Sequence, residues 1–357
     1  MTYDLRKSLK SMPKKILLRG TNWIGDAVMT LPAVASIRQT FPSAEITILA
    51  KPWVAEVYKL SPDIDRIFLF REPGIHQGIS GKVKLAAELK REGFEVAIYL
   101  QNAIEAAIIG WLAGIPVRAG FDSDCRGFLL THPVHRTKEI RAVYQVDYYL
   151  EMVKSLGCVP VPKEAHLEKS LLAAKAAHSL ELYGVPADSV LIGLAPGAMY
   201  GPAKRWFPER FGAVAKKLQE SFAAKVMIFG SKGDLETAEQ VQDAMGESAI
   251  NIVGKTGLDE AIALISRCSL FITNDSGLMH VAGALNVPTL AIYGSTNPVT
   301  TPPPGENSVI IRKEVSCSPC LKKECPTDFR CMELIGTDDV YEAARSILVK
   351  HGARQVE

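Results

Sequence analysis

Short apolar runs alternate with amphipathic stretches through the first part of the chain, and this alternation predicts strands followed by helices. Strands are expected at residues 15–19, 45–50, 66–70 and 95–100, and helices at residues 27–40, after Pro52, and at residues 83–92, 103–113 and 144–156. Pro32 should kink or restart the helix that contains it. Strands that alternate with helices indicate a mostly parallel sheet.

A second series of the same kind follows an irregular stretch at residues 114–140 and a connector formed by residues 159–162 and an alanine-rich helix at 169–182. Its strands are expected at residues 190–195, 225–230, 250–253, 270–273 and 289–293, with helices at 208–220, 234–245, 258–266 and 277–285. The fold class is therefore α/β, with two Rossmann-like domains whose parallel sheets face each other across a cleft. We expect a first domain at residues 1–180, a second at 181–336, and a last helix within 337–357 that packs back on the first.

Size and composition limit the class of protein. With 357 residues, 47% hydrophobic and 22% charged, the chain suits two soluble domains, and a net charge of +2 gives no reason to expect nucleic acid as a partner. No apolar run approaches the roughly 20 residues of a membrane-spanning helix. Residues 1–15 are polar and basic, unlike a secretory signal, and should form a loose lead-in whose lysines suit an anionic membrane surface. Seven cysteines, an odd number, indicate reduced thiols and a cytoplasmic location.

The stretch at residues 271–285 has the form of a ligand site. An apolar run is broken by Asn274, Asp275, Ser276 and Gly277, and a helix rich in small residues follows. The first N–H groups of such a helix are free and its dipole is positive there, so the turn suits an anion. Asp275 and His280 add groups that bond hydroxyls. The alternative is a helix simply capped by Asp275 or Ser276.

The loop after the first strand contains Gly25 and Asp26, outside the carboxyl end of a strand, where open α/β sheets bind ligands. Asp26 is either a helix cap or a general base. The loop lacks the G-x-G-x-x-G pattern, and the next strand ends at Lys51 without an acid for a nicotinamide-cofactor ribose. These features are unfavourable for a dehydrogenase.

The loop at residues 195–206 occupies the matching position in the second series and ends in Lys204, Arg205 and Trp206. Flexible backbone followed by a cation suits a diphosphate, whereas the alternative is a surface loop with solvated cations. Because the Asp275 loop is expected at the same sheet edge, the two together favour an anion site.

Two further patterns have simple explanations beside the chemical ones. Asp63 with Asp65, and Asp122 with Asp124, spell D-x-D, but turn chemistry explains the first and we expect no metal there. Cys317, Cys320, Cys325 and Cys331 form a compact group. Four thiolates can hold a structural zinc ion, or the four are reduced cysteines in a polar loop.

Three motifs together resemble the lipopolysaccharide heptosyltransferase family, glycosyltransferase family 9. They are Asn-Trp-Ile-Gly-Asp-Ala-Val-Met at residues 22–29, Ala-Pro-Gly-Ala at 195–198 with Lys-Arg-Trp at 204–206, and Thr-Asn-Asp-Ser-Gly-Leu-Met-His at 273–280. The resemblance extends from residue 15 to about residue 347. The first motif and the cysteine group are more similar to the heptosyltransferase II branch than to heptosyltransferase I. The resemblance implies the GT-B fold, with the active site between two Rossmann-like domains.

The resemblance also implies roles for single residues. Asp26 would be the general base, and Lys204 would bind the diphosphate and offset charge on the leaving group. The remaining implied contacts are with the donor: backbone N–H groups of Ser276, Gly277 and Leu278 on phosphate, Asp275 and His280 near the sugar, Thr256 by the adenine, Ser231 or Glu236 by the ribose, with Gly25, Met199 and Tyr200 nearby. Met199 and Tyr200 stand where some relatives carry hydroxyl residues.

The reaction implied by the resemblance moves L-glycero-D-manno-heptose from ADP-heptose to the heptosyl-Kdo inner core on lipid A. It would be one displacement with inversion and would need no divalent ion or other cofactor. The enzyme would work in the cytoplasm or peripherally at the inner face of the cytoplasmic membrane. Arginines of the irregular stretch either meet the acidic acceptor or form a solvated basic surface; they are Arg118, Arg126, Arg136 and Arg141.

Three alternatives remain open from the sequence. A heptosyltransferase of type I or III would use a different acceptor. A non-catalytic protein that binds nucleotide sugars would keep the fold, although the presence of both Asp26 and Lys204 is unfavourable for it. A Rossmann dehydrogenase or epimerase is opposed by the missing glycine pattern and by Lys51.

Overall fold

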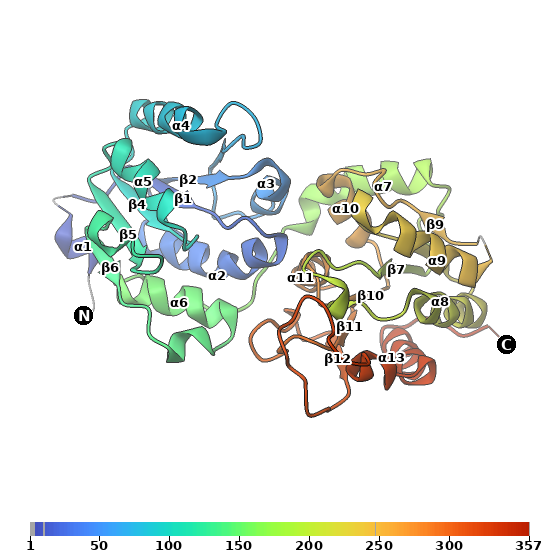
Figure 1. Ribbon diagram of the computed structural model, residues 1–357. Coiled ribbons are helices and arrows are strands. Elements are labelled where there is room, and N and C mark those ends of the chain that lie inside the picture. The colour runs from blue at the N-terminus through green and yellow to red at the C-terminus, as the bar shows by residue number, and fades with distance from the viewer. Residues whose placement is uncertain (1–3, 10, 247, 357) are drawn as a thin grey trace. The chain divides into compact units, whose positions relative to one another are not determined.

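Two six-stranded parallel sheets, one in each half of the chain, form the framework of the protein (Figure 1). The structure is a computed structural model, and it describes residues 4–9, 11–246 and 248–356. The chain divides into two compact units, Met1–Leu167 and Glu168–Glu357. Each unit builds its own sheet and covers it with its own helices.

The sheet of the first unit has the order β3-β2-β1-β4-β5-β6. Its strands are β1 (Lys15–Arg19), β2 (Glu45–Ala50), β3 (Arg66–Leu69), β4 (Val96–Tyr99), β5 (Val117–Phe121) and β6 (His132–Val134). The helices are α1 (Leu5–Ser8), α2 (Ile24–Thr40), α3 (Pro52–Tyr58), α4 (Gly78–Glu92), α5 (Ile104–Leu112) and α6 (Gln145–Ser155), with 3-10 turns η1 (Gly127–Leu129) and η2 (Glu139–Arg141).

The sheet of the second unit has the order β12-β11-β10-β7-β8-β9. Its strands are β7 (Leu191–Ala195), β8 (Lys225–Ile228), β9 (Ile250–Asn251), β10 (Leu270–Asn274), β11 (Thr289–Tyr293) and β12 (Ser308–Arg312). The helices are α7 (Ala173–Leu182), α8 (Pro208–Phe222), α9 (Leu235–Met245), α10 (Leu258–Ile265), α11 (Gly277–Ala284), α12 (Arg330–Glu333) and α13 (Thr337–Lys350), with 3-10 turns η3 (Lys169–Leu172), η4 (Pro202–Lys204) and η5 (Lys232–Asp234).

The two sheets have the same topology. Counted along the chain within each unit, both place the third, second, first, fourth, fifth and sixth strands side by side, which is the Rossmann order. All strand pairs are parallel, for example Leu17 beside Thr47 in one sheet and Ile272 beside Leu194 in the other. The predicted α/β class with two Rossmann-like domains is confirmed.

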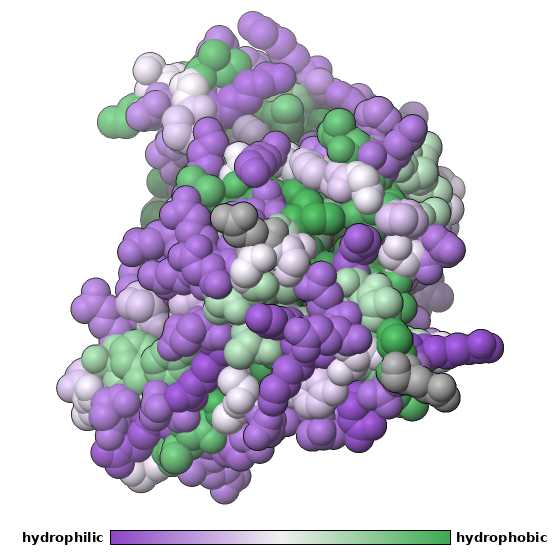
Figure 2. All heavy atoms as spheres, turned by 90° about the vertical axis from the view of Figure 1, so that its right-hand side faces the viewer, coloured by the Kyte–Doolittle hydropathy of each residue, from purple (hydrophilic) through white to green (hydrophobic). Residues whose placement is uncertain are grey.

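The central strands are buried because helices cover both faces of a parallel sheet. All five residues of β7, β10 and β11 are buried, which explains why these strands read as nearly continuous apolar runs. The core of the second unit also contains Trp206, whose ring meets Phe211 edge to face at 5.2 Å between centroids. Hydrophilic residues dominate the face drawn in Figure 2, and the hydrophobic ones between them form small groups.

The stretch predicted to be irregular contains regular structure, so that prediction is wrong. Residues 114–140 hold β5, β6 and η1. Both strands lie at one edge of the sheet and are short, and Arg118 and Pro133 interrupt their apolar pattern. The edge strand β12 was also not predicted, because part of it is exposed. Helix α2 continues through Pro32 and does not restart there.

The ends of the chain also differ from expectation. Part of the expected lead-in is folded: Leu5 is buried in α1, and its N–H donates to the carbonyl of Leu156 at 2.9 Å. Residues 1–3 and 10 lie outside the described residues. Helix α13 packs against α8, β10 and β12 of its own unit, with Val340 and Leu348 in that core. The expected packing of residues 337–357 on the first domain stays a prediction. The units divide after Leu167, so α7 belongs to the second unit although residue 180 was the expected boundary.

Among the described residues, no helix has both the length and the apolar character that crossing a bilayer requires.

Candidate functional site

Each sheet reverses its strand order between its first and fourth strands, and this reversal defines where ligands bind in such folds. In the first unit, the strands that follow β1 are added on one side of the sheet and the strands that follow β4 on the other. In the second unit, β7 and β10 are related in the same way. The loops after these strands border the crevice at the carboxyl edge of each sheet. Asp26 follows β1, Lys204 follows β7 and Asp275 follows β10, so all three lie in such loops.

A buried arginine, Arg19, holds the loop after β1. The Arg19 guanidinium donates to the carbonyls of Gly20 and Leu49 and, at 2.9 Å, to Oδ1 of Asn22. Burial lowers the pKa of Arg19 to about 10. A buried cation bonded to backbone carbonyls fixes the loop, since breaking these bonds would leave the charge without partners.

Two aromatic residues fix the loop from the side. The backbone N–H of Thr21 donates to the buried hydroxyl of Tyr58 at 3.1 Å. Nε1 of Trp53 donates to the carbonyl of Asn22 at 2.8 Å. The turn that precedes Asp26 is therefore held by hydrogen bonds with both aromatic side chains.

Asp26 lies in the first turn of α2 and is partly exposed, next to the buried Gly25. The N-cap position belongs to Trp23, so Asp26 does not occupy it. Burial, and secondarily the Asp26 carboxylate, raises the pKa of the Tyr149 hydroxyl well above its usual value. The carboxylate therefore lies near a neutral tyrosine at one side of the switch-point loop.

Two exposed tryptophans flank this loop, and the sequence did not single them out as functional. Trp23 is 60% exposed and Trp53 is 45% exposed. Both stand a few residues after a strand of the sheet, Trp23 beyond β1 and Trp53 at the start of α3 beyond β2. An aromatic residue just past a strand end was the available signal. Exposed rings of this kind suit the apolar face of a sugar.

In the second unit, Lys204 and Asp275 form an ion pair, with 2.6 Å between Nζ and Oδ2. Both side chains are largely buried. The two loops that carry them are joined by Asn274, which accepts from the N–H of Trp206 at 3.0 Å and donates to the carbonyl of Pro196 at 2.7 Å. The predicted anion site therefore has its cation and its acid in contact.

The start of α11 lies beside this pair. Ser276 occupies the N-cap position, but its Oγ lies 3.2 Å from Oγ1 of Thr273, and within the described structure no side chain caps the helix. Ser276, Gly277 and Leu278 are partly exposed. Of the two alternatives left open, side-chain capping is therefore not observed, and the first N–H groups of α11 are available for an anion.

His280 lies one turn into α11 and is buried. Burial lowers its pKa to about 4; the Asp275 carboxylate opposes this shift and the Lys204 ammonium adds to it. In the described part of the chain, Nδ1 of His280 is buried without a hydrogen-bond partner. With its pKa lowered to about 4, the imidazole is neutral at pH 7 and offers a hydrogen-bonding group there.

Met199 and Tyr200 lie between β7 and η4 and are exposed. The Tyr200 hydroxyl donates to the carbonyl of Leu321 at 2.8 Å, and Nζ of Lys204 lies 5.1 Å from the centroid of its ring. A cation over an aromatic face is attracted by the ring quadrupole. Tyr200 therefore helps to position Lys204, while Met199 offers an exposed apolar side chain.

The predicted nucleoside contacts are spread over the loops after β8 and β9. Ser231 forms a capping box with Asp234, its Oγ donating to Oδ2 at 2.7 Å, so its hydroxyl already serves the turn before α9. Glu236 is exposed on α9, and Thr256 is partly exposed in the turn before α10. The structure thus places Ser231 and Thr256 beyond neighbouring strands, without bringing either into contact with the Lys204 pair.

The four arginines between residues 118 and 141 that were considered for the acceptor do not form one basic surface. Arg126 is fully buried and donates to the carbonyls of Phe121 and Gln101, so the expectation of acceptor contact or solvation is wrong for it. Arg118 bonds the carbonyls of Leu129 and Ile115. The others are Arg136, which lies 5.4 Å from the ring centroid of Tyr148, and the exposed Arg141.

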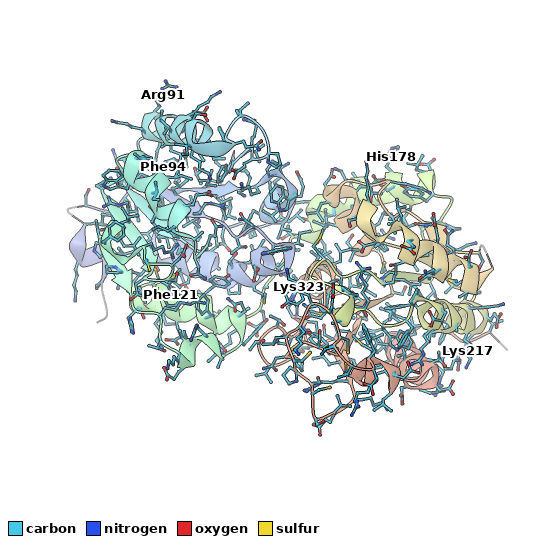
Figure 3. The ribbon with its side chains drawn as sticks, in the orientation of Figure 1. Arg91, Phe94, Phe121, His178, Lys217 and Lys323 are labelled. Atoms are coloured by element: carbon cyan, nitrogen blue, oxygen red, sulfur yellow. The ribbon has the colours of Figure 1, made fainter. Side chains whose placement is uncertain are left out.

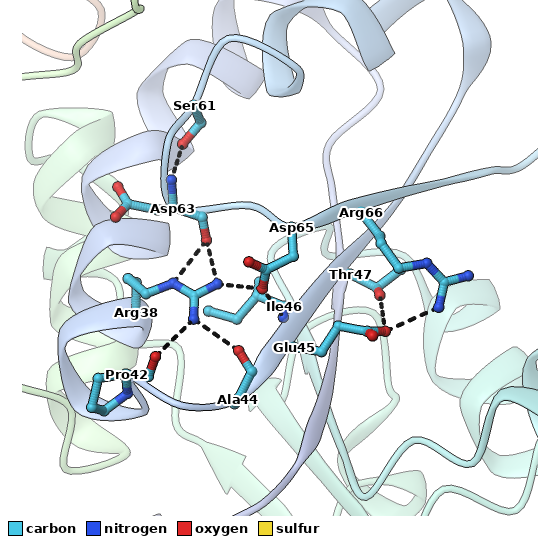
Figure 4. A network of polar contacts seen from close by, with 10 residues as sticks. All are labelled: Arg38, Pro42, Ala44, Glu45, Ile46, Thr47, Ser61, Asp63, Asp65 and Arg66. Atoms are coloured by element: carbon cyan, nitrogen blue, oxygen red, sulfur yellow. Dashed lines mark hydrogen bonds and ion pairs between the residues drawn. The ribbon is translucent and has the colours of Figure 1, made fainter.

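The two D-x-D patterns serve local structure. Asp65 accepts from Arg38 and, at 2.6 Å, from the N–H of Ile46, while Arg38 also bonds the carbonyl of Asp63 (Figure 4). Asp122 pairs with His135 at 2.8 Å, and Asp124 accepts from the N–H of Ile104 at 2.7 Å. Contacts with neighbouring segments therefore engage the aspartates of the first pair and of the second.

The cysteines are all free thiols. Cys331 is buried, and burial together with the neighbouring Cys317, Cys325 and Cys320 raises its pKa, which shows that the four lie near one another. Within residues 4–9, 11–246 and 248–356, no group of three or more His, Cys, Asp or Glu residues is arranged to hold a metal ion.

Comparison with known proteins gives consistent matches. Residues 82–329 match a family model described as glycosyltransferase family 9 (heptosyltransferase). The chain is 30% identical over 309 residues to lipopolysaccharide heptosyltransferase 2 of Escherichia coli K12, covering 84% of this chain and 88% of that protein. A structure of E. coli ADP-heptose lps heptosyltransferase II is similar with a TM-score of 0.79 and 26% identity, covering 95% of this chain and 100% of the other. A glycosyl transferase family 9 structure from Veillonella parvula gives a TM-score of 0.84 and 26% identity, covering 98% and 99%.

Proposed function

Because the chain belongs to glycosyltransferase family 9, the heptosyltransferases, we propose that it transfers L-glycero-D-manno-heptose from ADP-heptose to the heptosyl-Kdo inner core of lipopolysaccharide. The observation that carries the proposal is the Lys204–Asp275 pair beside the uncapped start of α11. The names of the E. coli relatives support the heptose donor and the lipopolysaccharide acceptor.

The second unit binds the donor in this mechanism. The Lys204 ammonium and the N–H groups of Ser276, Gly277 and Leu278 bind the diphosphate, since a cation and a helix N-terminus both favour negative charge. Asp275, oriented by Lys204 at 2.6 Å, accepts hydrogen bonds from hydroxyls of the heptose. Neutral His280 supplies a further hydrogen bond near the sugar. Thr256 contacts the adenine and Ser231 the ribose.

The first unit binds the acceptor and supplies the base. The acceptor hydroxyl oxygen attacks the anomeric carbon of the heptose, the bond from that carbon to the diphosphate oxygen breaks, and ADP leaves with the electron pair. Asp26 takes the hydroxyl proton. A single displacement of this kind inverts the anomeric centre. Lys204 and the start of α11 stabilise the charge that develops on the leaving diphosphate.

The acceptor is a lipid A-linked glycan, so the enzyme meets it at the inner face of the cytoplasmic membrane. The exposed ring of Trp23 lies on the loop that leads to Asp26, and that of Trp53 lies at the start of α3. We place the acceptor sugars against these rings, since aromatic faces pack on the apolar faces of sugars. The proposal uses neither a metal ion nor a cofactor, and no nucleic acid is a partner.

The donor part of the proposal is tested by comparing ADP-heptose with ADP-glucose and UDP-glucose, each with the same lipid-linked acceptor. Mass spectrometry of the lipid product and release of the nucleoside diphosphate are measured together. Heptose added only from ADP-heptose is the expected result. Release of ADP without a glycosylated lipid, or transfer of glucose at an equal rate, would overturn the assignment of the donor.

A further inference from the structure

Helix α5 presents apolar side chains to solvent as well as to the core. Ala106, Ala107 and Ile109 are buried against the sheet. On the other side, Ile108 is 40% exposed and Trp111 is 55% exposed, and Leu112 is exposed next to them. A helix that is apolar all round is normally covered on both sides. The outer side of α5 therefore lacks a partner within the described structure.

The neighbouring helix α4 and the turn η1 also carry exposed apolar side chains. α4 and η1 both pack against α5, and Lys82 on α4 pairs with Glu105 on α5 at 2.5 Å. On α4, Ile79 is 86% exposed, and Val83, one turn later, is also exposed. Phe128 in η1 is 81% exposed. We call the exposed residues the α4–α5 face; they are Ile79, Val83, Ile108, Trp111, Leu112 and Phe128.

The acidic and basic side chains of α4 and α5 differ in how far they are paired. The acidic ones have basic or imidazole neighbours, Glu105 with Lys82, Glu92 with Arg66 and Glu88 with His76, as has Glu72 with Lys82. The exposed Asp124 beside η1 accepts from the N–H of Ile104 and forms no ion pair among the described residues. Among the basic ones, Lys84, Lys90 and Arg91 are exposed on α4, and the described residues offer none of them an ion pair. Figure 3 shows Arg91 extending outward from α4.

We propose that the α4–α5 face docks on an anionic lipid bilayer. Aliphatic side chains and a tryptophan enter the boundary between headgroups and acyl chains, and free cations beside them bind lipid phosphates. The proposal rests on the proposed function, because a lipid-anchored acceptor requires the enzyme to work at a membrane. A second copy of the chain fits this face poorly, since pairing it with itself would place free cations of one copy near those of the other.

The test uses the full-length protein and sedimentation with phosphatidylcholine vesicles, made with or without phosphatidylglycerol. We expect wild type to bind the anionic vesicles about tenfold more tightly than the neutral ones, and to release them at high salt. Ile79→Ser with Trp111→Ser, and separately Lys84→Glu with Arg91→Glu, should each weaken anionic binding by about tenfold or more. Exposed residues of the second unit serve as matched controls, with Leu182→Ser and Lys350→Glu binding as wild type does.

Wild-type binding by both double variants would overturn the proposal. Failure of wild type to bind protein-free anionic vesicles, while it binds native membranes, would instead assign the face to a membrane protein.

The vesicle-binding measurement does not depend on catalysis. With a deacylated, water-soluble acceptor the docking variants should turn over as wild type does, and with an acceptor embedded in vesicles they should be slowed. Absence of transfer to either acceptor by wild type would count against the proposed function and leave vesicle binding as a separate result.

Discussion

Lys204 and Asp275 lie 71 residues apart in sequence, yet Nζ of one is 2.6 Å from Oδ2 of the other. Their contact joins the loop after β7 to the loop after β10, at the point where the strand order of the second sheet reverses. This contact couples the cation assigned to the diphosphate with the acid assigned to the heptose. Binding of the donor should therefore depend on both together.

Replacing Lys204 with alanine should lower the turnover of ADP-heptose by about 100- to 1000-fold, because one preorganised stabiliser of the leaving charge is lost. Steady-state kinetics with varied donor measure the effect. Lys216→Ala, an exposed lysine on α8, is the matched control and should behave as wild type. Unchanged donor kinetics in Lys204→Ala would refute the phosphate role.

Asp26→Asn should reduce turnover by about 100- to 10,000-fold, since the side chain keeps its size but no longer takes a proton. Donor affinity, measured by calorimetry with ADP-heptose, should stay within about twofold of wild type, because Asp26 lies in the other unit from the donor loops. Asp188→Asn, in an exposed loop, is the control. A variant that kept full turnover would remove Asp26 from the mechanism.

His280 should make stability depend on pH below neutrality. Its pKa is about 4 in the folded protein against an ordinary value of 6.5, so the unfolded chain binds more protons between these pH values. The free energy of unfolding should therefore fall as pH drops from 6.5 to about 4, by roughly 3 kcal/mol from this residue. Urea denaturation of wild type and His280→Gln over this range measures the difference.

In His280→Gln this part of the pH dependence should be absent, and above pH 7 its profile should run parallel to that of wild type. His178→Gln, on the exposed side of α7, controls for loss of an imidazole. Equal slopes of stability against pH for wild type and His280→Gln between pH 4 and 6.5 would mean that the buried imidazole is protonated as readily as in the unfolded chain.

Asn274→Ala should destabilise the protein by about 2–4 kcal/mol, because the N–H of Trp206 and the carbonyl of Pro196 lose their partner in a buried place. Both donor loops should also loosen, so donor affinity should fall. Chemical denaturation and donor calorimetry check the two effects. Asn307→Ala is the control, since the side chain of Asn307 bonds at the surface to Asn286. A change in stability as small as that of the control would mean that the two loops are held by other contacts.

Much of the fold could be predicted, because buried parallel strands read as apolar runs. The runs at Ile16–Leu18 and in β10 identify central strands, and the repeated alternation gives two Rossmann-like domains. The motifs at these strand ends also pointed to the family, and that resemblance is confirmed, including its likeness to heptosyltransferase 2. Edge strands such as β6 were missed because three residues with a proline carry too little pattern.

The candidate site could be predicted only as separate loops. The order of strands brings Lys204 and Asp275 to one edge, but the direct contact between them depends on how Asn274 ties the loops across 78 residues. The prediction for Arg126 was wrong because an arginine in a polar stretch is normally expected at the surface, whereas here carbonyls of neighbouring loops surround it. For Trp23 and Trp53 the sequence offered only an aromatic residue soon after a strand end, and it is their exposure beside the loop that marks them.

The most direct test of heptose transfer to the heptosylated inner core is product formation from ADP-heptose with two purified acceptors, Kdo-lipid A with and without its first heptose. We predict that wild type adds one heptose to the heptosylated acceptor only, detected as a mass increase of the lipid. Transfer to the bare acceptor alone would contradict the proposal and indicate a type I enzyme. Binding of ADP-heptose without transfer to either acceptor would also contradict it, and would indicate another acceptor or a protein that only binds the nucleotide sugar.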